Sequence, residues 1–179
     1  MKKCLPIFAL IAAVILLAGC APQTPPAAAM TYPFTVEGEL TRNDGGEPCA
    51  VSLQMTAGMT GELEFLSPAS LKGYRFSLTP EGTTLRYGDL SVPYRAGGLP
   101  GGADGLLKMF SVKEEYCRGR EKTEQNSTPL WKLTYAFPDG DTVTAYLSAD
   151  TGFPLCMILD SPQYENPLQL TVTKFTKDT

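Results

Sequence analysis

The sequence of 179 residues contains no histidine. This absence excludes Ser-His-Asp and Cys-His catalysis, imidazole acid–base chemistry and zinc sites with histidine ligands. Carboxylate pairs such as Glu62 and Glu64 remain, but they lie on the expected solvent face of a strand, and nothing in the sequence marks a cleft between them. We therefore expect a protein that is not an enzyme and that holds no metal ion and no cofactor.

Basic charge is also scarce. The chain carries 15 Lys and Arg residues against 19 Asp and Glu residues, which gives a net charge of −4. Nucleic acids and anionic lipid head groups attract basic surfaces, and no basic stripe runs along any expected strand. The composition therefore predicts that no nucleic acid is a partner.

Cysteine pairs with redox or metal-binding spacing are missing as well. Beyond residue 20 the chain has Cys49, Cys117 and Cys156, and no two of them form a Cys-x-x-Cys motif. Their number leaves two possibilities open, which are one disulfide with one free thiol, or free thiols throughout. Cys49 and Cys156 fall on the apolar side of their strand patterns, where a thiol acts as a small buried hydrophobic group.

The long apolar run of this sequence lies at its start. Two lysines precede an apolar segment at 5–17, which at roughly 13 residues is too short for the ~20 that span a bilayer. It ends in "LAGC", which resembles the lipobox of bacterial lipoproteins and has Cys20 as its last residue. We therefore predict a signal peptide at 1–19 and a diacylated Cys20, because two acyl chains hold a protein stably at a membrane. An ordinary signal peptide with a chance cysteine is the alternative.

Residues 20–30 are expected to form a stalk behind this anchor. Pro22, Pro25 and Pro26 stand among Ala, Gln and Thr, a composition that favours an extended polyproline II chain. Ten residues at about 3.1 Å each make a tether of roughly 30 Å. The sequence thus predicts a domain that is lipid-anchored at the extracytoplasmic face of a cell membrane and contacts that membrane through the lipidated Cys20.

Residues 31–179 are expected to form a single β domain. Phe34, Val36 and Leu40 share one face of a predicted strand, and polar residues share the other face. The same period of two returns up to residue 92 and again after residue 130, with turn clusters such as "NDGG" at 43–46 between the runs. This pattern predicts an antiparallel meander of about nine to eleven strands.

The middle of the chain departs from the strand pattern. Asp104 is expected to cap a short helix that ends near residue 113 and has Leu106, Leu107 and Phe110 on one face. The polar segment that follows, 113–129, is mixed in charge and is expected to be an exposed connection.

Several segments together resemble a known family. They are the lipobox and stalk, the first strand "FTVEGEL", the segment "SPASLKGYRFSL", and "DTGFPLCMILD" followed by "LQLTVTKF". In type and order they resemble the LolA, LolB and LppX superfamily of lipoprotein carriers and lipid-binding lipoproteins. The resemblance implies an unclosed β-barrel whose concave apolar face is covered by helices and accepts acyl chains. The expected fold class is therefore mainly β, a curved antiparallel meander forming a half barrel, with one short helical insertion where the superfamily usually has several.

Two functions fit these features. The first is a membrane-anchored extracytoplasmic lipoprotein that binds an apolar ligand, such as an acyl chain, a lipid or a lipoprotein, in the half barrel. Its candidate lining consists of large side chains on the inward strand faces, namely Phe34, Phe65, Tyr74, Phe76, Trp131 and Tyr135. The second is a scaffold for an envelope protein partner, in which the same side chains fill the core and no small molecule binds.

Overall fold

The computed structural model describes residues 32–42, 46–56, 60–79, 81–94, 99 and 102–177. The predicted signal peptide, the lipidation site Cys20 and the stalk lie outside the described residues, as does most of the expected turn at 43–46. Within the described ranges, no helix is long and apolar enough to cross a bilayer. The same ranges contain no cluster of three side chains that could hold a metal ion.

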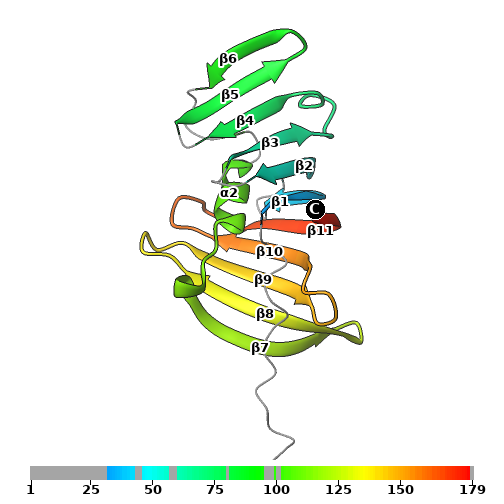
Figure 1. The fold of residues 1–179 in the computed structure, drawn as a ribbon, viewed down its shortest axis with the longest axis vertical. Helices are drawn as coiled ribbons and strands as arrows, with labels where there is room; N and C mark the ends of the chain where they lie inside the picture. The colour runs from blue at the N-terminus through cyan, green and yellow to red at the C-terminus, as the bar shows by residue number, and fades with distance from the viewer. Residues whose placement is uncertain are drawn as a thin grey trace, which may run out of the picture.

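The chain forms a single antiparallel sheet of 11 strands (Figure 1). In chain order the elements are β1 (Phe34–Arg42), β2 (Cys49–Thr56), β3 (Thr60–Phe65), β4 (Arg75–Thr79), β5 (Gly82–Tyr87), β6 (Leu90–Tyr94), the helix α2 (Asp104–Phe110), the 3₁₀ turn η3 (Glu114–Tyr116), β7 (Cys117–Gln125), β8 (Thr128–Ala136), β9 (Thr142–Ser148), β10 (Pro154–Asp160) and β11 (Leu168–Lys177). Within the sheet the strands follow the order β6-β5-β4-β3-β2-β1-β11-β10-β9-β8-β7. Two meanders are thus joined where the first strand pairs with the last.

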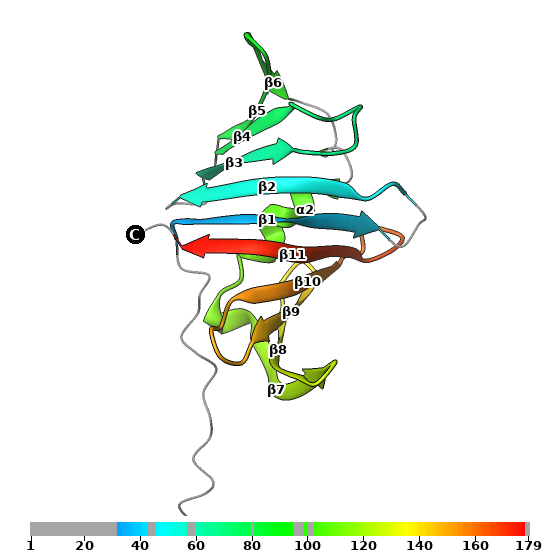
Figure 2. The same cartoon turned by 90° about the vertical axis from the view of Figure 1, so that its right-hand side faces the viewer.

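The sheet curves without closing on itself. β6 and β7 end the strand order and do not pair with each other. In Figure 2, β8 and β9 are steeply inclined to the central strands β1, β2 and β11. The predicted fold class is confirmed: the protein is mainly β, with an unclosed antiparallel sheet and one short α-helix among the described residues.

Alternating side chains give the sheet two unlike faces. In β1, Phe34, Val36 and Leu40 are at most 2% exposed, whereas the alternate residues Thr35, Glu37 and Glu39 are partly or fully exposed. We call the side that carries Phe34 the covered face, because α2 packs on it, and the opposite side the outer face. Burial of the apolar side chains on the covered face supplies the main stabilisation, at roughly 25 cal/mol per Å².

Helix α2 confirms the predicted helical insertion, with two differences in detail. It ends at Phe110 rather than near residue 113, and its N-cap residue is Ala103, so the expectation that Asp104 caps the helix is wrong. Asp104 instead accepts a hydrogen bond of 2.9 Å from the hydroxyl of Tyr164. Gly105 lets the helix approach the sheet closely, since a Cβ there would lie 2.5 Å from a methyl group of Leu168.

The segment 113–129 is mostly exposed, as expected, but the expectation that it is a connection without strands is wrong. This segment contains η3, the whole of β7 and the start of β8. β7 reads "CRGREKTEQ" and is exposed along almost its full length. An edge strand beyond the reach of the core has no face to bury, so it lacks the alternation that identifies a strand, and its charges discourage further strand addition.

Among the described residues, Cys49, Cys117 and Cys156 are free thiols. Cys49 is 5% exposed and joins the core, as the pattern predicts. Cys156 does not join the core. The buried residues of β10 are Pro154, Met157 and Leu159, and Cys156 lies on the outer face, partly exposed. The pairing of β10 with β9 shifts register between Pro154 and Cys156. Because apolar residues lie on both faces of β10, the sequence pattern does not show which face is inward.

Candidate functional site

The predicted lining residues lie together on the covered face. Tyr74 is partly buried. The other five are 0–7% exposed, namely Phe34, Phe65, Phe76, Trp131 and Tyr135. All six belong to, or pack against, one continuous core cluster. Their role as ligand contacts stays a prediction.

Side chains fill the centre of the covered face. The ring of Phe34 lies 5.2 Å from the ring of Phe110 in α2 and 5.3 Å from that of Phe175 in β11. The ring of Tyr32 stacks on Phe34 at 5.5 Å, and its hydroxyl donates a hydrogen bond of 3.0 Å to the carbonyl of Phe110. The helix therefore occupies the position where a deep acyl cavity would lie.

Polar contacts hold α2 in this position. Lys108 forms ion pairs with Asp139 and, at 3.2 Å, with Asp141, and its ammonium lies 4.4 Å from the centre of the Phe137 ring. Partial burial by itself lowers the pKa of Lys108, but hydrogen bonds to the two carboxylates outweigh this effect and raise it. The hydrogen bond from Lys108 lowers the pKa of Asp139.

A second contact ties the start of α2 to the β10–β11 loop. Tyr164 donates its hydroxyl to Asp104. Burial, reinforced by this hydrogen bond, raises the pKa of Tyr164 far above its usual value. The hydroxyl thus stays protonated and keeps its donor role at any physiological pH.

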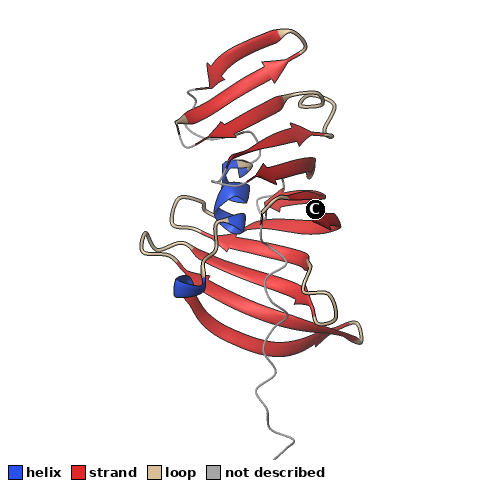
Figure 3. Ribbon diagram, in the orientation of Figure 1, coloured by secondary structure: helices blue, strands red, loops and turns tan. Residues whose placement is uncertain are grey.

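The covered face continues beyond the helix toward β6. In the views of Figures 1 and 3, β4, β5 and β6 extend past α2. Phe76 of the core pairs with Leu85, which pairs with Val92, and Tyr87 pairs with Leu90, so these side chains share the covered face. We call Leu85, Tyr87, Leu90 and Val92 the apolar strip.

The apolar strip is open to solvent. Tyr87 is 53% exposed, Leu90 59% and Val92 37%. Tyr87 is kept in place by stacking on Tyr74, with ring centres 4.7 Å apart. No charged residue belongs to the strip, because Arg75 and Arg86, paired across β4 and β5, project from the outer face. The strip is the exposed continuation of the core.

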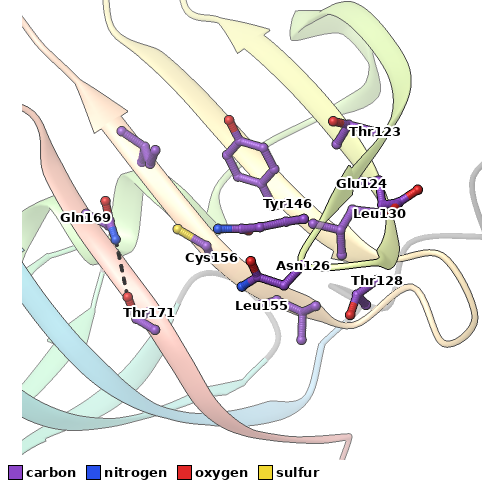
Figure 4. A pocket seen from close by; sticks show the side chains of 12 residues that line it. Thr123, Glu124, Asn126, Thr128, Leu130, Tyr146, Leu155, Cys156, Gln169 and Thr171 are labelled. Carbon is purple, nitrogen blue, oxygen red and sulfur yellow. Dashed lines mark hydrogen bonds between the residues drawn. The ribbon is translucent and has the colours of Figure 1, made fainter.

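A second feature, on the outer face, has no counterpart in the sequence-based predictions. The tip of the β7–β8 hairpin and the outer surfaces of β9, β10 and β11 enclose an open hollow of about 590 Å³ (Figure 4). Its lining residues are Thr123, Glu124, Gln125, Asn126, Thr128, Leu130, Tyr146, Leu155, Cys156, Ile158, Gln169 and Thr171. At the tip, Asn126 and Ser127 both have positive φ, at 50° and 61°, as a two-residue hairpin turn of type I′ requires.

The floor of this hollow is unexpectedly apolar for a solvent-side surface. Leu130 is 3% exposed, although it is not part of the core cluster on the other face. Across the neighbouring strands, Tyr146 lies opposite Cys156, and Ile158 lies opposite Gln169. Apolar residues on both faces of "PLCMILD" are the one trace of this site in the sequence, and that trace alone does not separate a binding surface from a core strand.

Among known proteins, this chain is similar to several solved structures. No family model matches the sequence, and no curated protein matches it. Similar solved structures include a domain of an outer membrane lipoprotein-sorting protein from Vibrio parahaemolyticus, at 12% identity and a TM-score of 0.47, covering 82% of this chain and 85% of the other. A LolA superfamily protein from Nitrosomonas europaea has 9% identity and a TM-score of 0.41, covering 89% and 88%. The lipoprotein LppX from Mycobacterium tuberculosis has 10% identity and a TM-score of 0.43, covering 81% and 87%.

These structures include members of the superfamily that the sequence resembles. The likeness concerns the course of the chain.

Proposed function

We propose that this protein is a lipoprotein anchored through Cys20 at the extracytoplasmic face of a cell membrane, and that its β domain binds an acyl chain on the apolar strip. The observation that carries the proposal is the exposure of Tyr87, Leu90 and Val92 on the face that elsewhere forms the core. Exposed apolar surface that continues a core is typical of a binding site.

An acyl chain suits this strip for two reasons. The strip offers apolar contact and no charge, so a hydrocarbon binds without leaving a buried charge unpaired. Because α2 fills the centre of the covered face, the ligand would lie along the β4–β6 end rather than in a deep cavity. We also propose that the protein binds its ligand without catalysis, in line with the absence of histidine.

A lipid-binding assay on matched variants tests this proposal. A fragment that starts at Met30 retains every described residue. We expect it to carry lipid in native mass spectrometry with organic extraction, and to bind a dansyl-labelled fatty acid. Leu90→Ser should weaken binding about five- to tenfold, because it removes about 1 to 1.4 kcal/mol of apolar contact.

The matched control lies next to Leu90 in the same strand. Ser91 projects from the outer face, so Ser91→Ala should bind the fatty acid as the parent does. Leu90 is 59% exposed, so its replacement should leave the urea midpoint unchanged. A lipid-free protein that ignores the fatty acid, or equal losses in both variants, would rule out acyl binding on the strip.

A protein partner is the second candidate for the same strip. The filled centre of the covered face favours a protein partner, because a protein surface binds to exposed side chains and does not require a cavity. Strand addition at an edge is less suitable, because β7 carries five charged residues and β6 contains Pro93, which lacks an N–H donor. A crosslinker on Leu90→Cys, and not on Ser91→Cys, should then join the protein to one envelope protein in native membranes.

A further inference from the structure

The hollow on the outer face has the features of a second binding site, and we propose that it binds a neutral carbohydrate. It lies on the opposite side of the sheet from the apolar strip, and the two share no residue. Its volume of about 590 Å³ falls within the range of roughly 300–1,000 Å³ that is usual for small-molecule sites.

The floor provides a platform for a sugar ring. Tyr146 stands between the hairpin tip and the outer surface of β10, with Leu130 on one side and Cys156 on the other (Figure 4). Sugar rings have one face made of C–H groups, and such a face packs against an aromatic ring and aliphatic side chains. Leu130 is buried, at 3% exposed, and forms a fixed part of the floor beside the ring.

The rim provides groups that match hydroxyls. Amides and hydroxyls both donate and accept hydrogen bonds, as sugar hydroxyls do, and the rim combines Asn126, Gln169, Thr128 and Thr171. Gln169 donates to the hydroxyl of Thr171 at 3.3 Å, which orients its amide along the edge of the hollow. Within the described part of the chain, the side chains of Glu124 and Asn126 make no hydrogen bond, so a ligand would meet them without breaking one.

Charge and polarity narrow the class of ligand. The 12 lining residues include one carboxylate, Glu124, and no Lys or Arg. A phosphate or another anion would find no cationic side chain among these lining residues and would face that carboxylate. An acyl chain would cover amides and hydroxyls without replacing their bonds to water, which costs free energy. A neutral molecule with many hydroxyls and one apolar face satisfies both the floor and the rim.

The free thiol of Cys156 provides a reporter at the site itself. The full chain is purified in an amine-oxide detergent, because a sugar-based detergent would compete. Maltotriose, cellobiose and the N-acetylglucosamine dimer are then added at millimolar concentration. Maleimide labelling of each cysteine is followed by peptide mass spectrometry at one mildly alkaline pH, since burial raises the pKa of the Cys156 thiol. We expect at least one sugar to slow labelling of Cys156 several-fold and to leave Cys117, on β7, unchanged.

Four variants test whether this protection depends on the proposed contacts. Tyr146→Ala should raise the sugar Kd about tenfold, and Tyr146→Phe, which keeps the ring, should leave it nearly unchanged. Gln169→Ala removes an amide of the rim and should also raise the sugar Kd. This variant provides the test of the site if Tyr146→Ala destabilises the fold and lowers the urea midpoint. Tyr87→Ala, on the apolar strip, should bind sugar normally, so failure of acyl binding and failure of sugar binding remain distinguishable.

Three results would overturn the proposal. One is the absence of Cys156 protection by every sugar of the panel. Another is protection that persists unchanged in both Tyr146→Ala and Gln169→Ala. The third is protection by laurate or by a proline-rich peptide in place of the sugars.

Discussion

Replacing Gly38 with alanine should weaken the sheet at the junction of its two meanders. Gly38 lies in β1 beside a register shift in the β1–β11 pairing. A Cβ at this position would lie 2.5 Å from the carbonyl oxygen of Thr171 and 2.9 Å from a methyl group of Leu170. The oxygen belongs to the backbone of a central strand, so it cannot move aside by a side-chain rotation.

The size of the effect follows from that distance. A carbon atom approaches a carbonyl oxygen to about 3.3 Å at closest, so the two strands must separate locally by about 0.8 Å. This separation weakens two ladder hydrogen bonds at about 1 kcal/mol each and adds about 1–3 kcal/mol of strain. The lower entropy of the unfolded chain returns about 0.5–1 kcal/mol. We expect Gly38→Ala to lower the free energy of unfolding by about 2–4 kcal/mol.

A matched glycine gives the control. Gly119 in β7 also lies beside a register shift, but the nearest atom to its Cβ position is 3.8 Å away, on the side chain of Thr134. Gly119→Ala should therefore be neutral or slightly stabilising. In urea unfolding, with a slope of about 2 kcal/mol per M, the midpoint of Gly38→Ala should fall by about 1–2 M. Equal midpoints for the two variants, within about 0.3 M, would refute this account of the junction.

Two further predictions concern the helix contacts and the anchor. Hydrogen bonding to Lys108 lowers the pKa of Asp139, so this contact stabilises the fold at neutral pH and is lost as the pH falls below about 4. Lys108→Met should accordingly show a smaller loss of urea midpoint between neutral pH and about pH 3 than the parent, and an equal loss would contradict the assignment. Separately, Cys20→Ala should abolish metabolic labelling with palmitate and move the protein out of the membrane fraction, whereas Cys156→Ala should keep both properties, and labelled Cys20→Ala protein would disprove the anchor.

Local alternation in the sequence was sufficient for most of the fold. Strands such as β1, β8 and β9 have one buried face, and a period of two records that face directly. The short helix was also predictable, because Leu106 and Phe110 repeat at helical spacing. β7 was missed for the same reason that the others were found, since an edge strand without a buried face has no period to detect.

The sequence by itself therefore determined a mainly β protein with one short helix, and it carried the pattern of a lipid anchor at Cys20. The tertiary structure decided that α2 fills the centre of the covered face, that the apolar strip stays open at the β6 end, and that the outer face has a hollow. The filled centre and the hollow join residues more than 30 positions apart, such as Phe34 with Phe110 and Leu130 with Gln169. A periodic pattern reports which way a side chain points along its own strand, but which side chains meet depends on how the whole chain buries its apolar surface.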